Sequence, residues 1–294
     1  MPELPKIFHL QFTPEHWSRL VRLRALLGKP LPTTRESYEG LDACIGHLQK
    51  YQVFARIADR IIPNLPKDRE ELDRYGASRN AHSEEFGALT EAMLCELYSS
   101  LDGLLQFLQA VYPTNRELKK IRFASSLFQS AKENKLSVVF PEPVRQTLAA
   151  AYDDWFDKLR NLRIEITHGT VGFFSFDELQ QSVTYFNNGL SSSSHQVFHI
   201  KDIVTVVRNF DTQVRALHEE IAKFFLSQLL PLPRMYTCGV YQGLLYIRMV
   251  APASDLNFHS GHCASWNWFE QQPEKFCPLA KQCGAYGRKW PVEM

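Results

Sequence analysis

Apolar residues recur at steps of three and four along most of the chain, the spacing that places side chains on one face of an α-helix. The segment 83–111 shows this most clearly. Ser83 stands at a capping position, with Glu84 and Glu85 near the positive end of the helix dipole, and Pro113 stops the helix. The apolar stripe of this predicted helix consists of Phe86, Met93, Leu97, Leu101, Leu104, Leu108 and Val111.

The same spacing predicts further helices. Thr13, followed by Pro14, is a typical helix start, and Pro63 and Pro66 open a polar linker that we expect to run to about residue 82. The helix that ends at His168 carries a stripe of Leu148, Tyr152, Trp155, Leu159, Leu162 and Ile166. The predicted helices cover residues 14–27, 36–62, 83–111, 115–133, 143–168 and 203–224.

Two segments depart from this period. Residues 171–200 contain short aromatic and β-branched runs separated by turn residues, which predicts a small β insertion. Residues 238–250 are typical of a hairpin, and the chain after residue 252 is rich in Trp, Cys, Gly and Pro with little periodicity. The sequence therefore predicts a mainly α protein with a small β insertion and an irregular tail.

Composition narrows the class of protein. The chain has 294 residues, of which 45% are hydrophobic and 22% charged, and 33 basic residues nearly balance 32 acidic ones. This balance excludes a histone-like polycation and an acidic disordered tail. With no apolar run of about 18 residues and no basic-then-apolar start, we expect a cytoplasmic protein without a membrane partner. Six cysteines are too few for a disulfide scaffold in a chain of this length.

The segment 158–170 concentrates the residues with the most useful chemistry. Arg163 lies beside the apolar stripe, and His168 follows five residues later, roughly 140° around an ideal helix. A guanidinium can hold a phosphate by two hydrogen bonds, and an imidazole can transfer a proton near neutral pH. Together they suit metal-free RNA cleavage. A cation near a helix C-terminus is also favourable without any catalytic role, and that interpretation stays open.

In this context, Arg163 followed after four residues by His168 resembles the signature of the HEPN superfamily, and so does the surrounding sequence LRNLRIEITHGTV. The helix over 83–111 is similar to the helix that packs against the motif helix in that family. The resemblance covers roughly residues 83–230. It implies a helical bundle that forms homodimers, in which two Arg/His motifs face each other and cleave RNA without a metal.

The motif departs from the family pattern at one position, and this leaves alternatives open. Ile164 stands where the family often has Asn, Asp or His. Arg160 and Asn161 form a polar pair one turn earlier, so the motif is either degenerate or shifted. An acidic residue sometimes assists in the family, and Glu96 and Asp102 are the candidates on the preceding helix.

The tail contains side chains of the types that zinc prefers. These are His259, His262, Cys263, Cys277 and Cys283, of which four would form a structural zinc site. Their spacing lacks the C-x2-C knuckles of common zinc fingers. The alternative is two ordinary surface histidines and three thiols without a metal.

We therefore expect three parts: an N-terminal helical region over 1–82, a HEPN-like domain over 83–233 and a tail over 234–294. The leading functional hypothesis is an endoribonuclease of a toxin–antitoxin or antiphage defence system, with no cofactor needed for catalysis and with an antitoxin or defence-system protein as partner. A non-catalytic HEPN-like module that binds RNA, a nucleotide or a protein is the alternative. A zinc-stapled interaction protein, in which the Arg/His pair is incidental, is a third reading.

Overall fold

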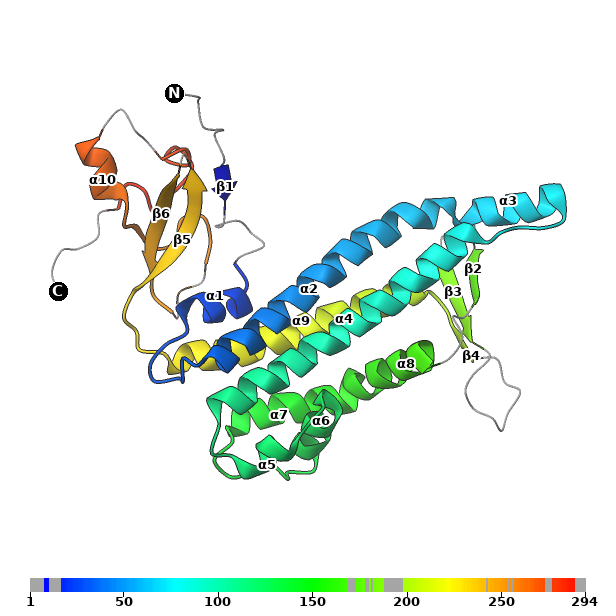
Figure 1. Cartoon of the computed structure of the whole chain (residues 1–294), viewed down its shortest axis with the longest axis horizontal. Coiled ribbons are helices and arrows are strands. Elements are labelled where there is room, and N and C mark those ends of the chain that lie inside the picture. Colours follow the sequence, from blue (N-terminus) through cyan, green and yellow to red (C-terminus); the bar gives the residue numbers. More distant parts are fainter. Residues whose placement is uncertain are drawn as a thin grey trace. The chain divides into compact units, whose positions relative to one another are not determined.

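A computed structural model describes residues 8–10, 17–168, 173–177, 180, 182–187, 198–241, 243–252, 254, 256–272 and 277–288. The chain forms two compact units. Residues 39–218 form one, here called the helical unit. Residues 1–38 and 219–294 form the other, here called the sheet unit. Figure 1 labels the elements of both.

Long helices build the helical unit, and the closest approach between two of them depends on glycine. A side chain at Gly40 on α2 would meet the backbone nitrogen of Phe107 on α4 at 2.5 Å. Gly103 on α4 faces Ala43 and Cys44 in the same way, so both glycines let the two helices pack with their backbones close together. The helices of this unit are α2 (Arg35–Ile61), α3 (Leu65–Tyr75), α4 (Ala81–Val111), α5 (Arg116–Lys120), α6 (Ala124–Lys132), α7 (Glu142–Ala151), α8 (Asp157–His168) and the first part of α9 (Ile203–Gln228).

The core of the helical unit follows the predicted stripes. All seven stripe residues predicted on α4 are buried. On α9 the stripe from Ile203 to Ile221 is buried, but Phe225 rather than Phe224 continues it. α9 also contacts its neighbours through polar groups, because Arg215 donates to the carbonyl of Leu48 on α2 at 3.3 Å. Mainly helical structure is therefore confirmed.

Two expectations about the helices were wrong. Residues 63–82 are not a polar linker, because a short 3-10 turn (Ile62–Asn64) and α3 occupy most of it. Each has a proline as its second residue, and proline fits the first turn of a helix as well as a loop. The single helix predicted over 115–133 is divided into α5 and α6. The Nε2 atom of Gln109 donates to the carbonyls of Leu118 and Ile121, at 2.9 and 2.8 Å, and stabilises that break.

The ends of two predicted helices also differ. α4 begins at Ala81 rather than at Ser83, so Ser83 is not its N-terminal cap. The expected start at Thr13 and Pro14 lies outside the described residues. The first helix, α1 (Arg19–Leu26), is capped by the hydroxyl of Ser18, which accepts a hydrogen bond from the backbone of Val21 at 3.2 Å.

The helix that carries the Arg/His motif is continuous but changes its winding. A π-helical turn, η3 (Tyr152–Phe156), joins α7 to α8. Trp155 and Phe156 of this turn are buried, and Phe156 stacks on Phe128 of α6 with ring centroids 3.9 Å apart. Packing on α6 therefore holds the start of α8 in place.

The β insertion is confirmed as a three-stranded antiparallel sheet in the order β2-β3-β4. Its strands are β2 (Phe173–Asp177), β3 (Ser182–Asn187) and β4 (Phe198–Ile200). Val183 and Tyr185 of the central strand are buried. Phe174 packs edge-on against Phe86 at the start of α4, with centroids 5.2 Å apart, so the sheet lies on the helical unit.

A second antiparallel sheet forms the centre of the sheet unit, with strand order β1-β5-β6-β7. The predicted hairpin corresponds to β5 (Arg234–Tyr241) and β6 (Leu244–Val250). β1 (Phe8–Leu10) pairs with β5, and β7 (His262–Cys263) pairs with β6. The short helix α10 (Trp266–Gln271) follows β7. Phe269 of this helix stacks on Tyr246, with centroids 5.5 Å apart.

The two units divide the chain differently from the expected boundaries at residues 82 and 233. Residues 39–82 belong with the helices that follow them, because α2 packs on α4. Residues 1–38 belong instead with the C-terminal strands, because β1 pairs with β5 and Arg234 donates to the carbonyl of Leu26 at 2.7 Å. Among the described residues, no helix is long and apolar enough to cross a membrane.

Candidate functional site

The packing of α8 decides where its charged residues stand. Leu159, Leu162 and Ile166 are buried, because their spacing of three and four places them on one face. Arg163 follows Leu162 directly and is half-buried at the edge of that face. The pairing of α8 with α4 therefore positions the Arg163 side chain.

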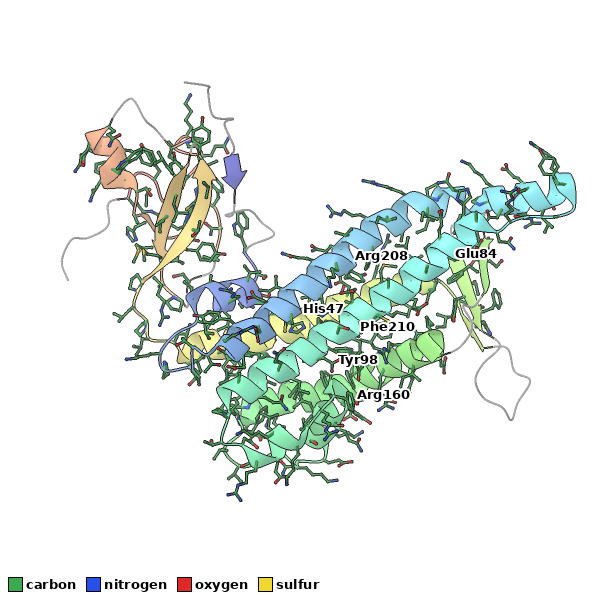
Figure 2. All side chains as sticks on the ribbon, viewed as in Figure 1. His47, Glu84, Tyr98, Arg160, Arg208 and Phe210 are labelled. Atoms are coloured by element: carbon green, nitrogen blue, oxygen red, sulfur yellow. The ribbon has the colours of Figure 1, made fainter. Side chains whose placement is uncertain are left out.

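Arg163 lies against α4. Its Cζ atom is 5.3 Å from the centre of the Tyr98 ring, which is within the range of a cation–π interaction. Its charge also acts on Cys95: burial raises the pKa of this thiol, and the nearby guanidinium of Arg163 opposes the rise. Figure 2 labels Tyr98 on α4 and Arg160 on α8.

The two acidic candidates on α4 have different partners. Glu96 is bound to α2, since its Oε2 atom is 2.5 Å from Nδ1 of His47. Asp102 accepts a hydrogen bond at 2.9 Å from the backbone nitrogen of Ala124 at the start of α6. Burial raises the pKa of Asp102, while this hydrogen bond and the charge of Arg163 oppose the rise. The charge of Arg163 therefore acts on Asp102, while Glu96 is paired with His47.

The alternative pair one turn earlier is engaged within its own helix. Nη2 of Arg160 lies 2.8 Å from Oδ1 of Asp157 and also donates to Oδ1 of Asn161 at 3.1 Å. Asn161 in turn donates to Oδ2 of Asp157 at 3.1 Å. These three polar side chains form a network on the outer surface of α8, separate from the Arg163 contacts with α4.

α8 ends at His168, five residues after Arg163. The backbone of His168 lies within the helix, but its side chain is outside the described part of the structure. The direction of its imidazole relative to the Arg163 guanidinium therefore stays a prediction from helix geometry, and so does the pairing of two chains.

The tail brings some of its predicted zinc ligands together. Cys263, Cys277 and Cys283 line one cavity of about 20 Å³ in the sheet unit, which is room for about one water-sized occupant. The histidines do not line it. His259 is exposed, and its Nδ1 accepts a hydrogen bond from the backbone of Gly284 at 3.0 Å. His262 precedes Cys263 on β7, and neighbouring residues of a strand face opposite sides.

Sequence reasoning missed two residues of this cavity, Cys238 on β5 and Arg248 on β6. The alternation of inward and outward positions along each strand could have indicated both residues. Tyr236 and Cys238 alternate on the buried face of β5, and Arg248 occupies a buried position of β6 between Tyr246 and Val250. A charged residue at an inward position of an alternating strand indicates a specific partner inside.

The cavity thiols are poor nucleophiles in their free form. Burial raises the pKa of Cys263 to about 11, and it also raises the pKa values of Cys238 and Cys277. A nucleophilic cysteine requires the thiolate, so this cluster is not typical of cysteine catalysis. Among the described side chains, no group of three or more His, Cys, Asp or Glu already stands in an arrangement that could hold a metal ion.

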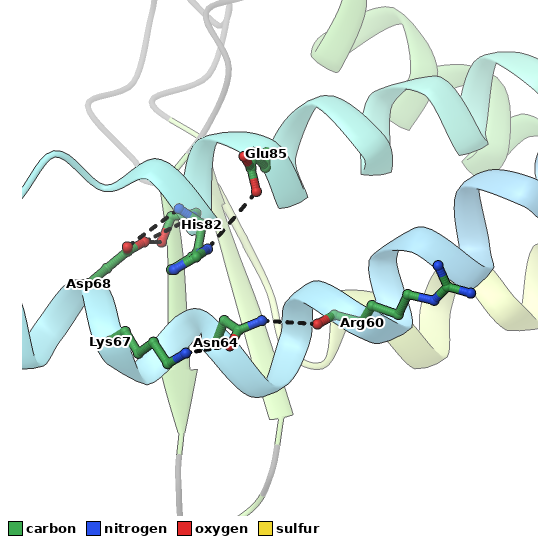
Figure 3. Close-up of polar contacts among 7 residues, drawn as sticks. Arg60, Asn64, Lys67, Asp68, His82 and Glu85 are labelled. Carbon is green, nitrogen blue, oxygen red and sulfur yellow. Dashed lines mark hydrogen bonds and ion pairs between the residues drawn. The ribbon is translucent and has the colours of Figure 1, made fainter.

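A second cavity, of about 180 Å³, lies between α3, the start of α4 and β2. Asp68 lines it and ties α3 to α4. Its Oδ2 atom accepts hydrogen bonds at 2.8 Å from both the backbone nitrogen and the hydroxyl of Ser83, and Oδ1 accepts one from His82 at 3.3 Å (Figure 3). The carboxylate thus satisfies N–H groups in the first turn of α4, which gives it a structural role.

Comparison with protein-family models, with curated proteins and with solved structures gave no match.

Proposed function

We propose that this chain is a metal-independent endoribonuclease, with Arg163 and His168 of α8 at its active site. The observation that carries the proposal is the position of Arg163. Its guanidinium lies over Tyr98 and near Asp102, at the edge of the packed face of α8, one and a half turns before the helix ends at His168. The sequence of this helix thus has a residue with a permanent positive charge five positions before one that can transfer protons.

In the proposed reaction, a ribose 2′-hydroxyl attacks the adjacent phosphorus, and the bond to the 5′-oxygen of the next nucleotide breaks. Arg163 stabilises the negative charge that develops on the phosphoryl oxygens. One imidazole removes the proton from the 2′-hydroxyl, and a protonated imidazole donates one to the leaving 5′-oxygen. The products are a 2′,3′-cyclic phosphate and a 5′-hydroxyl.

This reaction needs two proton-transfer groups, and each chain offers one histidine in the motif. Two copies related by a two-fold axis supply a base and an acid from equivalent residues. A homodimer is therefore part of the proposal. An antitoxin or another protein of a defence system would act by blocking this site or by exposing it.

Purified protein incubated with RNA in EDTA tests the proposal. We expect cleavage that EDTA leaves unchanged and that His168→Ala lowers by about 10²–10⁴-fold, the usual contribution of a general acid or base. Arg163→Ala should lower it comparably. His199→Ala, an exposed histidine on β4, is the matched control and should retain activity. Full cleavage by His168→Ala would refute the proposal.

One observation favours a second candidate, a module that binds RNA without cleaving it. Ile164 follows Arg163 and is 39% exposed, so an apolar side chain occupies a solvent-facing position next to the motif. RNA binding without cleavage, unaffected by His168→Ala, would support this candidate. Loss of activity in Arg160→Ala but not in Arg163→Ala would instead move the active motif by one turn.

A further inference from the structure

Four cysteines from separate parts of the sheet unit surround one small cavity. Cys238 belongs to β5, Cys263 to β7, and Cys277 and Cys283 to the chain that follows α10. All four are free thiols. Four sulfur donors around space for about one water-sized particle is the donor set and the size of a tetrahedral thiolate site.

The backbone directs these sulfurs inward. Thr237 pairs with Ile247 and Gly239 with Tyr246, so Cys238 is the extra residue of a β-bulge, a feature that re-aims a side chain. Cys263 stands opposite Arg248 in the pairing of β7 with β6. Its backbone nitrogen donates to the carbonyl of Ala285 at 3.0 Å, which brings the last cysteine segment beside β7.

The last two cysteines are held in one closed loop. The backbone nitrogen of Ala280 donates to the carbonyl of Cys277 at 2.9 Å, and that of Cys283 donates to the carbonyl of Leu279 at 2.9 Å. Successive turns of this kind place Cys277 and Cys283 on the same side of a compact loop. Backbone hydrogen bonds therefore hold this segment in shape.

Arg248 supplies the second, independent observation. Its side chain is 1% exposed, and Nε and Nη2 lie 3.1 Å from the sulfur of Cys238 and 3.3 Å from the sulfur of Cys283. Nη1 donates to the carbonyls of Phe258 and Ser260, at 3.2 and 2.9 Å. A neutral thiol is a weak acceptor, whereas a metal-bound thiolate is a strong one, so a buried guanidinium aimed at two sulfurs matches the donor that zinc-bound thiolates accept from.

We propose that Cys238, Cys263, Cys277 and Cys283 bind one structural zinc ion, with Arg248 donating hydrogen bonds to two of the zinc-bound sulfurs. Binding releases four protons, one from each thiol, and gives a Zn(Cys)4 centre with a net charge of −2 that Arg248 partly offsets. In such a centre each sulfur would lie about 2.3 Å from the zinc ion. His259 and His262 are not ligands in this proposal.

The direct test is metal analysis of the full-length wild-type protein, produced under reducing conditions without a histidine tag. We expect one zinc per chain and X-ray absorption that shows sulfur neighbours only. A metal-free protein, iron instead of zinc, a disulfide among the four cysteines or a mixed nitrogen and sulfur shell would each overturn the proposal.

Variants then identify the ligands. Cys238→Ser should lose the zinc, whereas the double variant His259→Ala with His262→Ala should keep it. Cys95→Ser, a cysteine of the helical unit, is the matched control. Zinc retained by Cys238→Ser but lost by the histidine variant would contradict the assignment.

A titration of the metal-free wild type with Co²⁺ keeps the test independent of any variant that fails to fold. A tetrahedral tetrathiolate site gives intense charge-transfer and visible bands, whereas their absence would contradict the site. Arg248→Gln should retain the stoichiometry and weaken zinc binding by about 10–100-fold, the usual effect of losing a group that contacts a metal ligand. Unchanged affinity would remove Arg248 from the proposal. None of these measurements depends on RNA cleavage.

Discussion

The helical unit and the sheet unit bury different chemistry. In the helical unit an apolar core, as in the stripe of α4 from Phe86 to Val111, accompanies a few buried polar side chains such as Ser100 and His218. The sheet unit buries two arginines, Arg22 at 2% and Arg248 at 1% exposure, and surrounds one cavity with thiols. Both units bury apolar area, and the sheet unit adds buried guanidinium groups, whose stabilising contribution depends on specific hydrogen-bond partners.

This contrast extends to how the elements meet. In the helical unit, α4 and α9 each bury a continuous stripe of apolar side chains along their length. The sheet unit joins distant segments through few residues, including Arg234, whose Nη1 donates to the carbonyl of Leu26, and Glu219, whose Oε2 accepts from the backbone of Arg19 at 2.8 Å. Three perturbations separate the two kinds of stability.

Removal of the proposed zinc should have the largest effect, and only on the sheet unit. Zinc binding by small thiolate sites is linked to folding by on the order of 10 kcal/mol. After chelation, we expect rapid hydrogen exchange in β5, β6 and β7, while α2 and α4 stay protected. Hydrogen exchange followed by mass spectrometry of peptides from both units measures this, and equal loss of protection in both would contradict the contrast.

Phe107→Ala should act in the opposite unit. Phe107 is fully buried on α4, and truncation of such a side chain costs about 3–5 kcal/mol through lost burial and the cavity left behind. We expect exchange to accelerate in α2 and α4 while zinc content is unchanged. Leu245→Ala, at a position 54% exposed on β6, is the control and should change the free energy of unfolding by less than about 0.5 kcal/mol.

Lowering the pH should produce the smallest of these effects on stability, through protonation of His218 of the helical unit when the chain unfolds. Burial, with a smaller contribution from Arg215, lowers the pKa of His218 from 6.5 to about 3, and its Nε2 lies 3.1 Å from the hydroxyl of Ser100. The folded state therefore keeps this histidine neutral, while the unfolded chain binds a proton below pH 6.5. Its contribution is complete above pH 6.5 and is lost as the pH falls toward 3, by about 2 kcal/mol at pH 5.

Denaturant unfolding of the wild type and of His218→Gln between pH 8 and pH 5 checks this sign. The wild type should lose more stability than the variant as the pH falls, because glutamine does not titrate. Parallel curves for the two proteins would show that His218 does not carry the effect.

The spacing of apolar residues was sufficient to predict the long helices, because the apolar side chains that must face a core recur regularly along the sequence. The prediction failed at prolines, because proline occurs both in loops and in the first turn of a helix. Pro63 and Pro66 were interpreted as breaks in the chain, although each occupies the first turn of a helix. The break between α5 and α6 depends on the side chain of Gln109, which lies outside the segment that it interrupts.

The candidate sites show the same limit. Arg163 was proposed from its motif with His168, and the acidic residues on α4 from the family resemblance. The structure adds their partners: the charge of Arg163 acts on Asp102, and Glu96 pairs with His47. Cys238 was missed because the other cysteines of the cavity follow it by 25 residues or more, from Cys263 onward, and only strand pairing brings them together. No local spacing rule contains that information.

The pairing of β1 with β5 also sets the order in which the two units can be completed during synthesis. Phe8 pairs with Tyr241, so the first strand leaves the ribosome long before the strand beside which it lies. At about 5–20 residues per second, the delay is on the order of tens of seconds. All segments of residues 39–218 emerge within that interval, so the helical unit is complete while β1 still has an open edge that a chaperone or another nascent chain can occupy.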